Sequence, residues 1–186
     1  MDSVNSVTSD FSIRPARPGD EHDIFALVQG LAEYEHLTHA VTGSAHKLAQ
    51  DLFGSRPAAE VLVVETALFA SSAPLALGVE AQQPLVAFAL FFHNYSTFLT
   101  QPGLYLEDIF VLPAHRRRGI GKALLKAVAR LARERNCGRL EWSVLDWNAS
   151  AITFYESLGA SVLPDWRICR VTAESLTALA APELIG

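Results

Sequence analysis

The sequence predicts a single domain of mixed α/β class. Three observations favour this class: 186 residues suit one domain, half of them are hydrophobic, and strand-sized apolar runs alternate with stretches of helical period. We expect residues 1–10 to be a disordered tail and residues 11–186 to form the domain, without an internal repeat or a linker.

The first half of the chain is expected to hold three strands and two helices. Ile24, Leu27, Val28 and Leu31 recur at the spacing of one helix face, after a turn at Pro18-Gly19 and the cap residue Asp20. Leu85–Phe92 is apolar without interruption, which is typical of a strand buried on both faces. The other expected elements are a strand at Phe11–Arg14, a helix carrying Leu48, Leu52 and Phe53, a strand at Val61–Phe69, and turns at Ser71–Pro74 and Gln82–Pro84.

The second half is expected to continue this alternation. A strand at Leu104–Val111 follows the turn pair Pro102-Gly103. A helix then carries an apolar stripe formed by Leu124, Val128 and Leu131, and Asn136 and Gly138 end it. The last expected elements are a strand through Leu140, Trp142 and Val144, a helix at Asn148–Leu158 that ends at Gly159, and a strand at Trp166–Val171.

Composition and charge disfavour several classes of function. The formal net charge of -5 argues against a nucleic-acid partner, whose phosphates require a basic surface, and no apolar run is long enough to span a membrane. Residues 1–10 carry no secretory signal, so we expect a cytoplasmic protein. Cys137 and Cys169 are interpreted as reduced thiols and not as nucleophiles, since neither sits beside a histidine. The histidines form no ligand pattern, so no metal is expected.

A basic segment with two glycines lies between the strand at Leu104–Val111 and the following helix. It reads Arg116-Arg117-Arg118-Gly119-Ile120-Gly121. A loop that enters a helix N-terminus presents unpaired backbone N–H groups, and the helix dipole adds a partial positive charge there. Glycine removes the Cβ atom that would hold an anion off the backbone. The segment therefore predicts a pyrophosphate site, and a solvated basic surface is the alternative.

The same segment matches the (Gln/Arg)-x-x-Gly-x-(Gly/Ala) signature of a known family. Through Arg116, Gly119 and Gly121 the sequence resembles the GNAT family of acetyl-CoA-dependent N-acetyltransferases. Further segments are similar to the diamine, or spermidine/spermine, N-acetyltransferase group: Ile13–Ala16, Leu31–Glu35, Leu104–Val111, Trp147-Asn148, Phe154-Tyr155 and Gly159-Ala160. The resemblance implies the family's fold, a mostly antiparallel twisted sheet that is splayed between its fourth and fifth strands and flanked by helices.

The resemblance also implies which residues bind acetyl-CoA. In the family the pantetheine arm enters the gap between the splayed strands, and the loop binds the pyrophosphate. The residues at the matching positions are Ile109, Phe110 and Val111 for the pantetheine, Arg116, Arg117, Arg118, Gly119, Ile120, Gly121 and Lys122 for the pyrophosphate, and Asn148 and Ser150 at the start of the later helix. A plain buried strand is the alternative for the first group, and an ordinary helix N-cap is the alternative for Asn148.

Direct acetyl transfer to an amine needs a base and an acid. An alkyl ammonium, with a pKa near ~10.4, must lose a proton before it can attack a thioester. Glu107 interrupts an apolar strand, and the resemblance gives the matching glutamate the role of base; a structural carboxylate is the alternative. Tyr155 matches the family's general acid, which protonates the leaving thiolate; a core aromatic is the alternative.

The resemblance implies a primary amine of a small cationic molecule, such as a diamine or polyamine, as substrate, and a homodimer as the assembly. The positions that match residues near the amine are acidic or aromatic: Tyr34, Glu35, Glu107, Asp108 and Trp166. Pro164 and Asp165 precede Trp166 where the family is more acidic, so a lysine-like or thialysine-like amino acid is an alternative substrate. The remaining alternatives are a protein amine, a non-catalytic acetyl-CoA-binding module and nucleic-acid binding through His115–Arg118.

Overall fold

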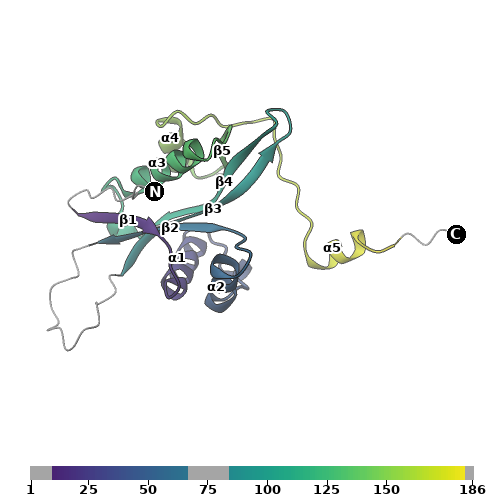
Figure 1. Cartoon of the computed structure of the whole chain (residues 1–186), viewed down its shortest axis with the longest axis horizontal. Helices are drawn as coiled ribbons and strands as arrows, with labels where there is room; N and C mark the ends of the chain where they lie inside the picture. Colours follow the sequence, from purple (N-terminus) through teal and green to yellow (C-terminus); the bar gives the residue numbers. More distant parts are fainter. Residues whose placement is uncertain (1–9, 67–83, 183–186) are drawn as a thin grey trace. The chain divides into compact units, whose positions relative to one another are not determined.

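The computed structural model describes residues 10–66 and 84–182 of the chain. These residues belong to two compact units, 1–143 and 144–186. The first unit holds a five-stranded sheet and three α-helices, and the second holds two short helices, α4 (Ala149–Glu156) and α5 (Ala173–Leu179) (Figure 1). The tail expected at residues 1–10 lies almost entirely outside the described residues, as do the turns expected at Ser71–Pro74 and Gln82-Gln83.

The sheet follows the order of its strands in the chain, β1-β2-β3-β4-β5. The strands are β1 (Phe11–Pro15), β2 (Glu60–Thr66), β3 (Leu85–Ser96), β4 (Gln101–Val111) and β5 (Leu140–Trp142). The first three pairings are antiparallel and the last, between β4 and β5, is parallel. The mostly antiparallel sheet expected from the sequence is therefore confirmed.

Helices cover both faces of the sheet. Helices α1 (Glu21–Tyr34) and α2 (Ala45–Phe53) lie on one face, and α3 (Ile120–Glu134) lies on the other (Figure 1). The apolar stripe predicted for α1 is buried against the sheet, where Ile24 and Leu27 join Phe88 and Phe110 in one core cluster. On the opposite side Leu124 and Val128 of α3 are fully buried. Two short 3-10 helices, η1 (Thr38–Ala40) and η3 (Pro113–His115), lie in the connections.

Strands β4 and β5 separate after a short stretch of pairing. Leu104, Tyr105 and Leu106 pair with Leu140–Trp142, and β4 then continues to Val111 without a described strand on that side. The backbone polar groups of β4 that point to this side beyond Leu106 therefore need other partners, and the Val111 carbonyl finds one in Arg116 Nε at 3.0 Å. This is the splay that the family resemblance implied.

A β-bulge lies in β4 at the same level. Leu90 faces Asp108 while Phe91 faces Leu106, so Glu107 is the extra residue. The Arg135 guanidinium, at the C-terminal end of α3, lies 5.9 Å from the ring centroid of Phe91. Leu106 is opposite Phe91 in the strand pair, so its side chain lies on the same face of the sheet. Beyond the bulge Phe110 packs with α1 instead. The bulge thus moves Asp108, two residues before Phe110, to the α1 face.

Two expectations about the second half are corrected, and one helix was missed. Pro102 and Gly103 lie inside β4 and not in the turn, which falls at residues 97–100. Residues Trp166–Val171 form no strand, although their apolar alternation predicted one. Trp166 and Ile168 are 75% and 72% exposed, and a strand forms only where its backbone finds a partner edge. Helix α5, which begins just after this segment, was not predicted.

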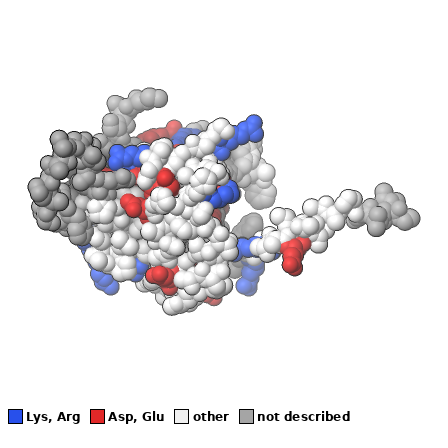
Figure 2. Space-filling model, turned by 90° about the horizontal axis from the view of Figure 1, so that it is seen from below, with Lys and Arg blue, Asp and Glu red and all other residues white. Residues whose placement is uncertain are grey.

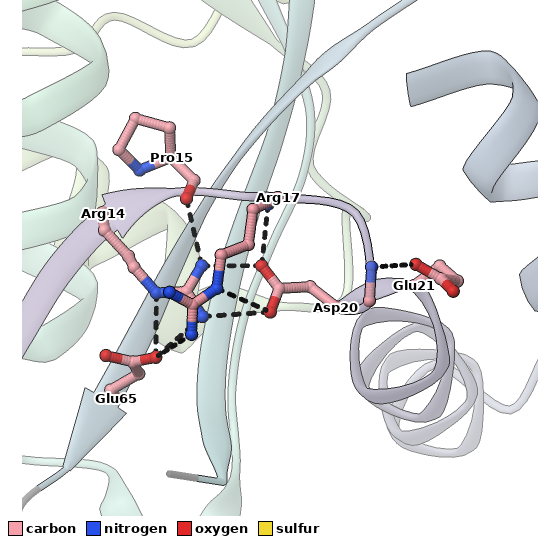
Figure 3. A network of polar contacts seen from close by, with 7 residues as sticks. Arg14, Pro15, Arg17, Asp20, Glu21 and Glu65 are labelled. Atoms are coloured by element: carbon pink, nitrogen blue, oxygen red, sulfur yellow. Dashed lines mark hydrogen bonds and ion pairs between the residues drawn. The ribbon is translucent and has the colours of Figure 1, made fainter. Parts of the chain in front are cut away.

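A buried carboxylate ties β1 to the start of α1. The side chain of Asp20, the N-cap residue of α1, is fully buried. It accepts hydrogen bonds from the Arg14 guanidinium at 2.6 and 3.0 Å and from the Arg17 backbone N–H at 2.8 Å (Figure 3). Arg14 also donates to Glu65 of β2 at 2.8 Å. One arginine therefore links two strands and a helix terminus.

Burial and hydrogen bonding act in opposite directions on Asp20. Burial alone raises the pKa of its carboxyl group, but the bonds from Arg14 and Arg17 outweigh this effect and leave the pKa below its ordinary value. Because the folded-state pKa is lowered, the ionised Asp20 stabilises the fold above the unfolded pKa of ~3.9. This contribution is lost as the pH falls through the folded value.

We predict that Asp20→Asn lowers the free energy of unfolding at pH ~7 by about 2–4 kcal/mol, because Arg14 loses a buried ionic partner. The difference from the unchanged protein should shrink as the pH falls below about 4, where Asp20 itself becomes protonated. Urea unfolding at both pH values measures this. Asp51→Asn is the matched control, because the ion pair of Asp51 with Lys47 is exposed and should contribute less than about 1 kcal/mol. Equal losses in the two variants would contradict the role of Asp20.

Candidate functional site

The predicted anion loop is connected to the N-terminus of α3 through Gly119. Gly119 is the N-cap residue, with φ 80° and ψ -2°, in the left-handed region that favours glycine. Its carbonyl accepts from the Ala123 N–H at 2.9 Å, and no side chain caps the helix. No atom outside its chain neighbours lies within 4 Å of the position that a Cβ of residue 119 would take. The backbone here is open to a ligand, and an anion fits the free N–H groups of the first helical turn.

The basic side chains of the loop have different partners. The Arg116 guanidinium lies 4.6 Å from the ring centroid of Tyr34 and 5.6 Å from that of Phe110, and its Nε donates to the Val111 carbonyl at 3.0 Å. Arg118 lies 3.7 Å from the Asp10 carboxylate. Within residues 10–66 and 84–182, Arg117 and Lys122 make no ion pair. Their charges are therefore the most available for phosphate oxygens.

The cofactor residues expected on β4 lie next to this loop. Ile109, Phe110 and Val111 form the last part of β4, beyond its pairing with β5. The Val111 side chain lies 3.8 Å from the position of a Cβ added to Gly121 at the start of α3. The structure therefore brings the strand expected to hold pantetheine and the loop expected to hold pyrophosphate together. Both groups of residues fit the parts of acetyl-CoA assigned to them.

Three carboxylates gather where α1 ends near β4. Glu35 is the C-cap residue of α1, and the bulge moves Asp108 to the α1 face. Burial, followed by the negative charges of Glu107 and Glu35, raises the pKa of Asp108 to about 6. Burial also raises the pKa of Glu35. No hydrogen bond or ion pair of Asp108 is found in the described part of the chain, so this acidic cluster is suited to a cation.

Four expected site residues belong to the second unit. Asn148 caps α4, where its Oδ1 accepts from the Ala151 N–H at 3.2 Å and from the Ser150 hydroxyl at 3.1 Å. Tyr155 is half-buried on α4, with its ring centroid 5.4 Å from that of Phe154. Trp166 is largely exposed. The N-cap alternative for Asn148 is thus observed, whereas contacts of these four residues with cofactor or substrate stay predictions.

The sequence did not reveal three features of the first unit. The stacking of Arg116 on Tyr34 joins residues far apart in the chain, and only the match of both segments to one family could have indicated it. The bulge at Glu107 leaves no mark in the apolar pattern. The statement that neither cysteine sits beside a histidine is wrong for Cys137, whose Sγ lies 4.0 Å from His93 Nδ1. These residues are 44 positions apart, and the fold brings them together.

The described surface carries no other feature that redefines the site. Figure 2 shows acidic and basic side chains interspersed over the face that it displays, without a continuous basic stripe among its described atoms. Within the described ranges no group of three or more His, Cys, Asp or Glu residues could hold a metal ion. None of the helices described here has the length and apolar character needed to cross a bilayer.

Sequence comparison identifies related proteins along most of the chain. The model of the acetyltransferase (GNAT) family matches residues 44–160. Thialysine N-epsilon-acetyltransferase of Bos taurus is 39% identical over 172 residues, covering 90% of this chain and 96% of that protein. L-ornithine N5-acetyltransferase of Arabidopsis thaliana is 37% identical over 199 residues, covering 90% and 86%. The human spermidine/spermine N(1)-acetyltransferase-like protein 1 is 31% identical over 93% of this chain, but over only 24% of its own length.

Comparison of structures finds the same fold at low sequence identity. An integron cassette protein from the mobile metagenome of V. cholerae matches with a TM-score of 0.71 and 23% identity, over 92% of this chain and 98% of that one. An aminoglycoside acetyltransferase from an uncultured soil metagenomic sample matches with a TM-score of 0.68 and 15% identity, over 88% and 97%. These likenesses confirm the fold class expected from the sequence.

We predict that Gly119→Val weakens the binding of coenzyme A at least about tenfold, because the new side chain occupies the open space beside the free N–H groups. The substitution also strains a left-handed residue, at a cost of about 1–2 kcal/mol. Gly19→Val is the matched control for strain, since Gly19 has φ 103° and similarly open surroundings. Titration calorimetry measures the affinities of both folded variants. Equal affinity in Gly119→Val and Gly19→Val would remove this loop from the cofactor site.

Proposed function

This chain belongs to the GNAT family of acetyl-CoA-dependent N-acetyltransferases, and from this premise we propose that it acetylates the terminal primary amine of a small cationic molecule. The observation that carries the proposal is the acidic cluster of Glu35, Glu107 and Asp108 beside the free end of β4. Glu35 and Asp108 are half-buried and Glu107 is exposed. The negative charges of Glu107 and Glu35 act on Asp108, and an ammonium group relieves that repulsion. Acetyl-CoA supplies the acetyl thioester.

The cluster also supplies a proton acceptor. We retain Glu107 as the proposed base, and its place in the bulge supports this because bulges often re-aim side chains at active sites. Asp108, with its pKa raised to about 6, is mostly ionised at pH ~7 and still close enough to neutrality to accept a proton. Tyr155 is the proposed acid that protonates the leaving thiolate.

The proposed residues for acetyl-CoA follow from the loop and the strand. Backbone groups of Ile109, Phe110 and Val111 would hold the pantetheine, and the segment from Arg116 to Lys122 would hold the pyrophosphate. Arg117 and Lys122 would provide the charge, and the Gly119 region the backbone N–H groups. Asn148 and Ser150 stay proposed cofactor residues on family resemblance.

Two kinds of substrate remain in view, and the comparisons favour one. The names of the Bos taurus and Arabidopsis relatives, which match over most of their length, are thialysine and L-ornithine acetyltransferases, whereas the spermidine/spermine-like relative matches over a small part of its length. We therefore place an amino acid with a terminal amine before a diamine or polyamine.

The alternatives of other classes have less support. A non-catalytic acetyl-CoA-binding module needs the loop and β4 only. In such a module the electrostatic repulsion among the three carboxylates would cost stability without serving the binding of acetyl-CoA. A protein amine would need an extended groove for a peptide. The homodimer implied by the family resemblance stays a prediction.

We predict that acetyl transfer to L-ornithine or thialysine proceeds with a kcat/KM at least about tenfold above that for a diamine of equal chain length. A monoamine without a carboxylate should be the poorest acceptor, because it carries a single charge and the proposed site contains several charged side chains. Release of free coenzyme A, measured over this panel with and without added salt, tests the order. Turnover on peptides alone would replace the proposed substrate class, and an absence of turnover on every amine would favour the binding module.

We predict different effects of replacing the two carboxylates on the pH dependence of kcat/KM. In the unchanged protein the rate should fall as the pH drops through about 6, because Asp108 then gains a proton and loses its negative charge. Asp108→Asn should remove this inflection. Glu107→Gln deletes a negative charge that raises the pKa of Asp108, so the acid limb should move to lower pH.

The same profiles assign the base. If Glu107 accepts the proton, Glu107→Gln should lower the rate near pH ~7 by about 10²–10⁴-fold and recover partly in alkali, where more amine is already neutral. Glu33→Gln, on an exposed position of α1, is the matched control and should leave the profile unchanged. A full neutral rate in Glu107→Gln together with a lost rate in Asp108→Asn would transfer the role of base to Asp108.

A further inference from the structure

Gly30 lies in the interior of α1, where glycine is unfavourable for a helix. A glycine inside a helix loses more conformational freedom on folding than alanine does, and it offers no side chain to pack. Elsewhere on the part of α1 that meets the sheet, residues such as Ile24 and Leu27 bury apolar side chains. A residue without a side chain beside them therefore needs an explanation in the packing.

The explanation is the close approach of the Phe110 ring to the helix backbone. A Cβ atom added at Gly30 would lie 3.1 Å from Cε1 and 3.3 Å from Cζ of that ring. Carbon atoms pack best at about 3.5–4.0 Å, so even the methyl group of an alanine would have to displace the ring by a few tenths of an ångström. Phe110 is 4% exposed and belongs to the core cluster, so its ring has little room to turn aside.

A displaced Phe110 ring would move the parts of the protein that are proposed to hold acetyl-CoA. Phe110 pairs with β3, but beyond Leu106 no described strand pairs with the other side of β4. A strand end that is held on one side yields more easily than a helix or the middle of a sheet. The same ring lies 5.6 Å from the guanidinium carbon of Arg116, the first residue of the loop proposed for the pyrophosphate. Helix α1, the end of β4 and this loop therefore meet around one aromatic ring.

We propose that Gly30 is a positioning residue for the binding of acetyl-CoA. In this role it contacts neither the cofactor nor the amine. Because it has no side chain, the Phe110 ring packs against the backbone of α1, and this packing sets the place of the end of β4 and of Arg116. The proposal rests on the assignment of these two parts to acetyl-CoA under the proposed function. It makes a helix position outside the residues proposed for cofactor and amine a determinant of cofactor affinity.

The substitution Gly30→Ala separates this role from a purely structural one. Alanine improves the helix while its methyl group displaces the ring, so the two effects on stability oppose each other and the thermal unfolding temperature should change little. The affinity for coenzyme A receives only the second effect. We expect titration calorimetry on the full-length protein to show this affinity weakened about three- to tenfold, less than the roughly 10²-fold loss that a misplacement of about 1 Å can cause.

A double-mutant cycle tests whether the effect passes through the ring. Phe110→Leu removes Cε1 and Cζ, the two atoms that the added methyl group would meet. In the Phe110→Leu background, Gly30→Ala should therefore change the affinity for coenzyme A by less than about twofold. Equal losses in the two backgrounds overturn the proposal, as does an unchanged affinity in a folded Gly30→Ala protein. If Gly30→Ala alone does not fold, the Phe110→Leu background decides, because there the proposal requires a folded protein with the affinity of Phe110→Leu alone.

Two further variants keep the outcomes distinct. Gly43→Ala is the matched control, since a Cβ at Gly43 would lie at an ordinary distance of 3.8 Å from Cε2 of Phe25, and its affinity for coenzyme A should equal that of the unchanged protein. Gly119→Val, measured alongside, tests the cofactor site itself. If Gly119→Val keeps its full affinity, the proposed cofactor site fails and the role of Gly30 is overturned with it. If Gly119→Val weakens binding and Gly30→Ala does not, only the role of Gly30 is overturned.

Discussion

Strand β4 pairs with β3 along its length but with β5 over only three residues, and the candidate site depends on this difference. Where β5 ends, the backbone of β4 keeps polar groups that need partners. The bulge at Glu107 directly follows the last residue of β4 that pairs with β5. The side chains of β4 therefore switch to the other face of the sheet where the pairing with β5 ends. A longer β5 would satisfy these groups and close the gap. The candidate site is therefore built by interrupted strand pairing and not by an added loop.

Arg116 connects the parts that surround this gap. Its guanidinium contacts Tyr34 at the end of α1 and Phe110 on β4, and its Nε donates to Val111, while its backbone begins the loop to α3. Cation–π contacts of this kind contribute about 0.5–1 kcal/mol each at exposed sites. That energy is small for folding but large enough to bias a side chain between two positions. A phosphate that drew Arg116 away would end its contacts with Tyr34 and Phe110.

The sequence predicted those features that are fixed by local pattern. The stripe of Leu124 and Val128 and the glycine at the helix entrance specified α3 and its loop, because helical period and left-handed backbone depend on near neighbours. The strand expected at Trp166–Val171 failed because alternation indicates a strand only if an edge is present to receive it. The contact of Cys137 with His93 was beyond prediction, since it depends on the distance between the end of α3 and one position of β3. Strand register and helix packing decide such contacts, and neither can be predicted from a short segment of the sequence.

Asp20 and Asp108 show two different effects of this fold on the pKa of a buried or half-buried carboxyl group. Asp20 is fully buried, yet Arg14 and a backbone N–H hold its pKa below the ordinary value. Asp108 is half-buried, and its neighbours Glu107 and Glu35 add negative charge, so its pKa rises to about 6. The fold pairs the buried Asp20 with an arginine, which makes the lack of such a partner for Asp108 within the described residues informative.

An unfavourable clustering of negative charge persists at sites where a ligand relieves it. A bound ammonium would stabilise the ionised carboxylates and lower the pKa of Asp108, so the binding of the amine and the ionisation of its acceptor favour each other. The carboxylate whose ionisation is unfavourable in the free protein, Asp108, is therefore one of the groups proposed to bind a cationic amine.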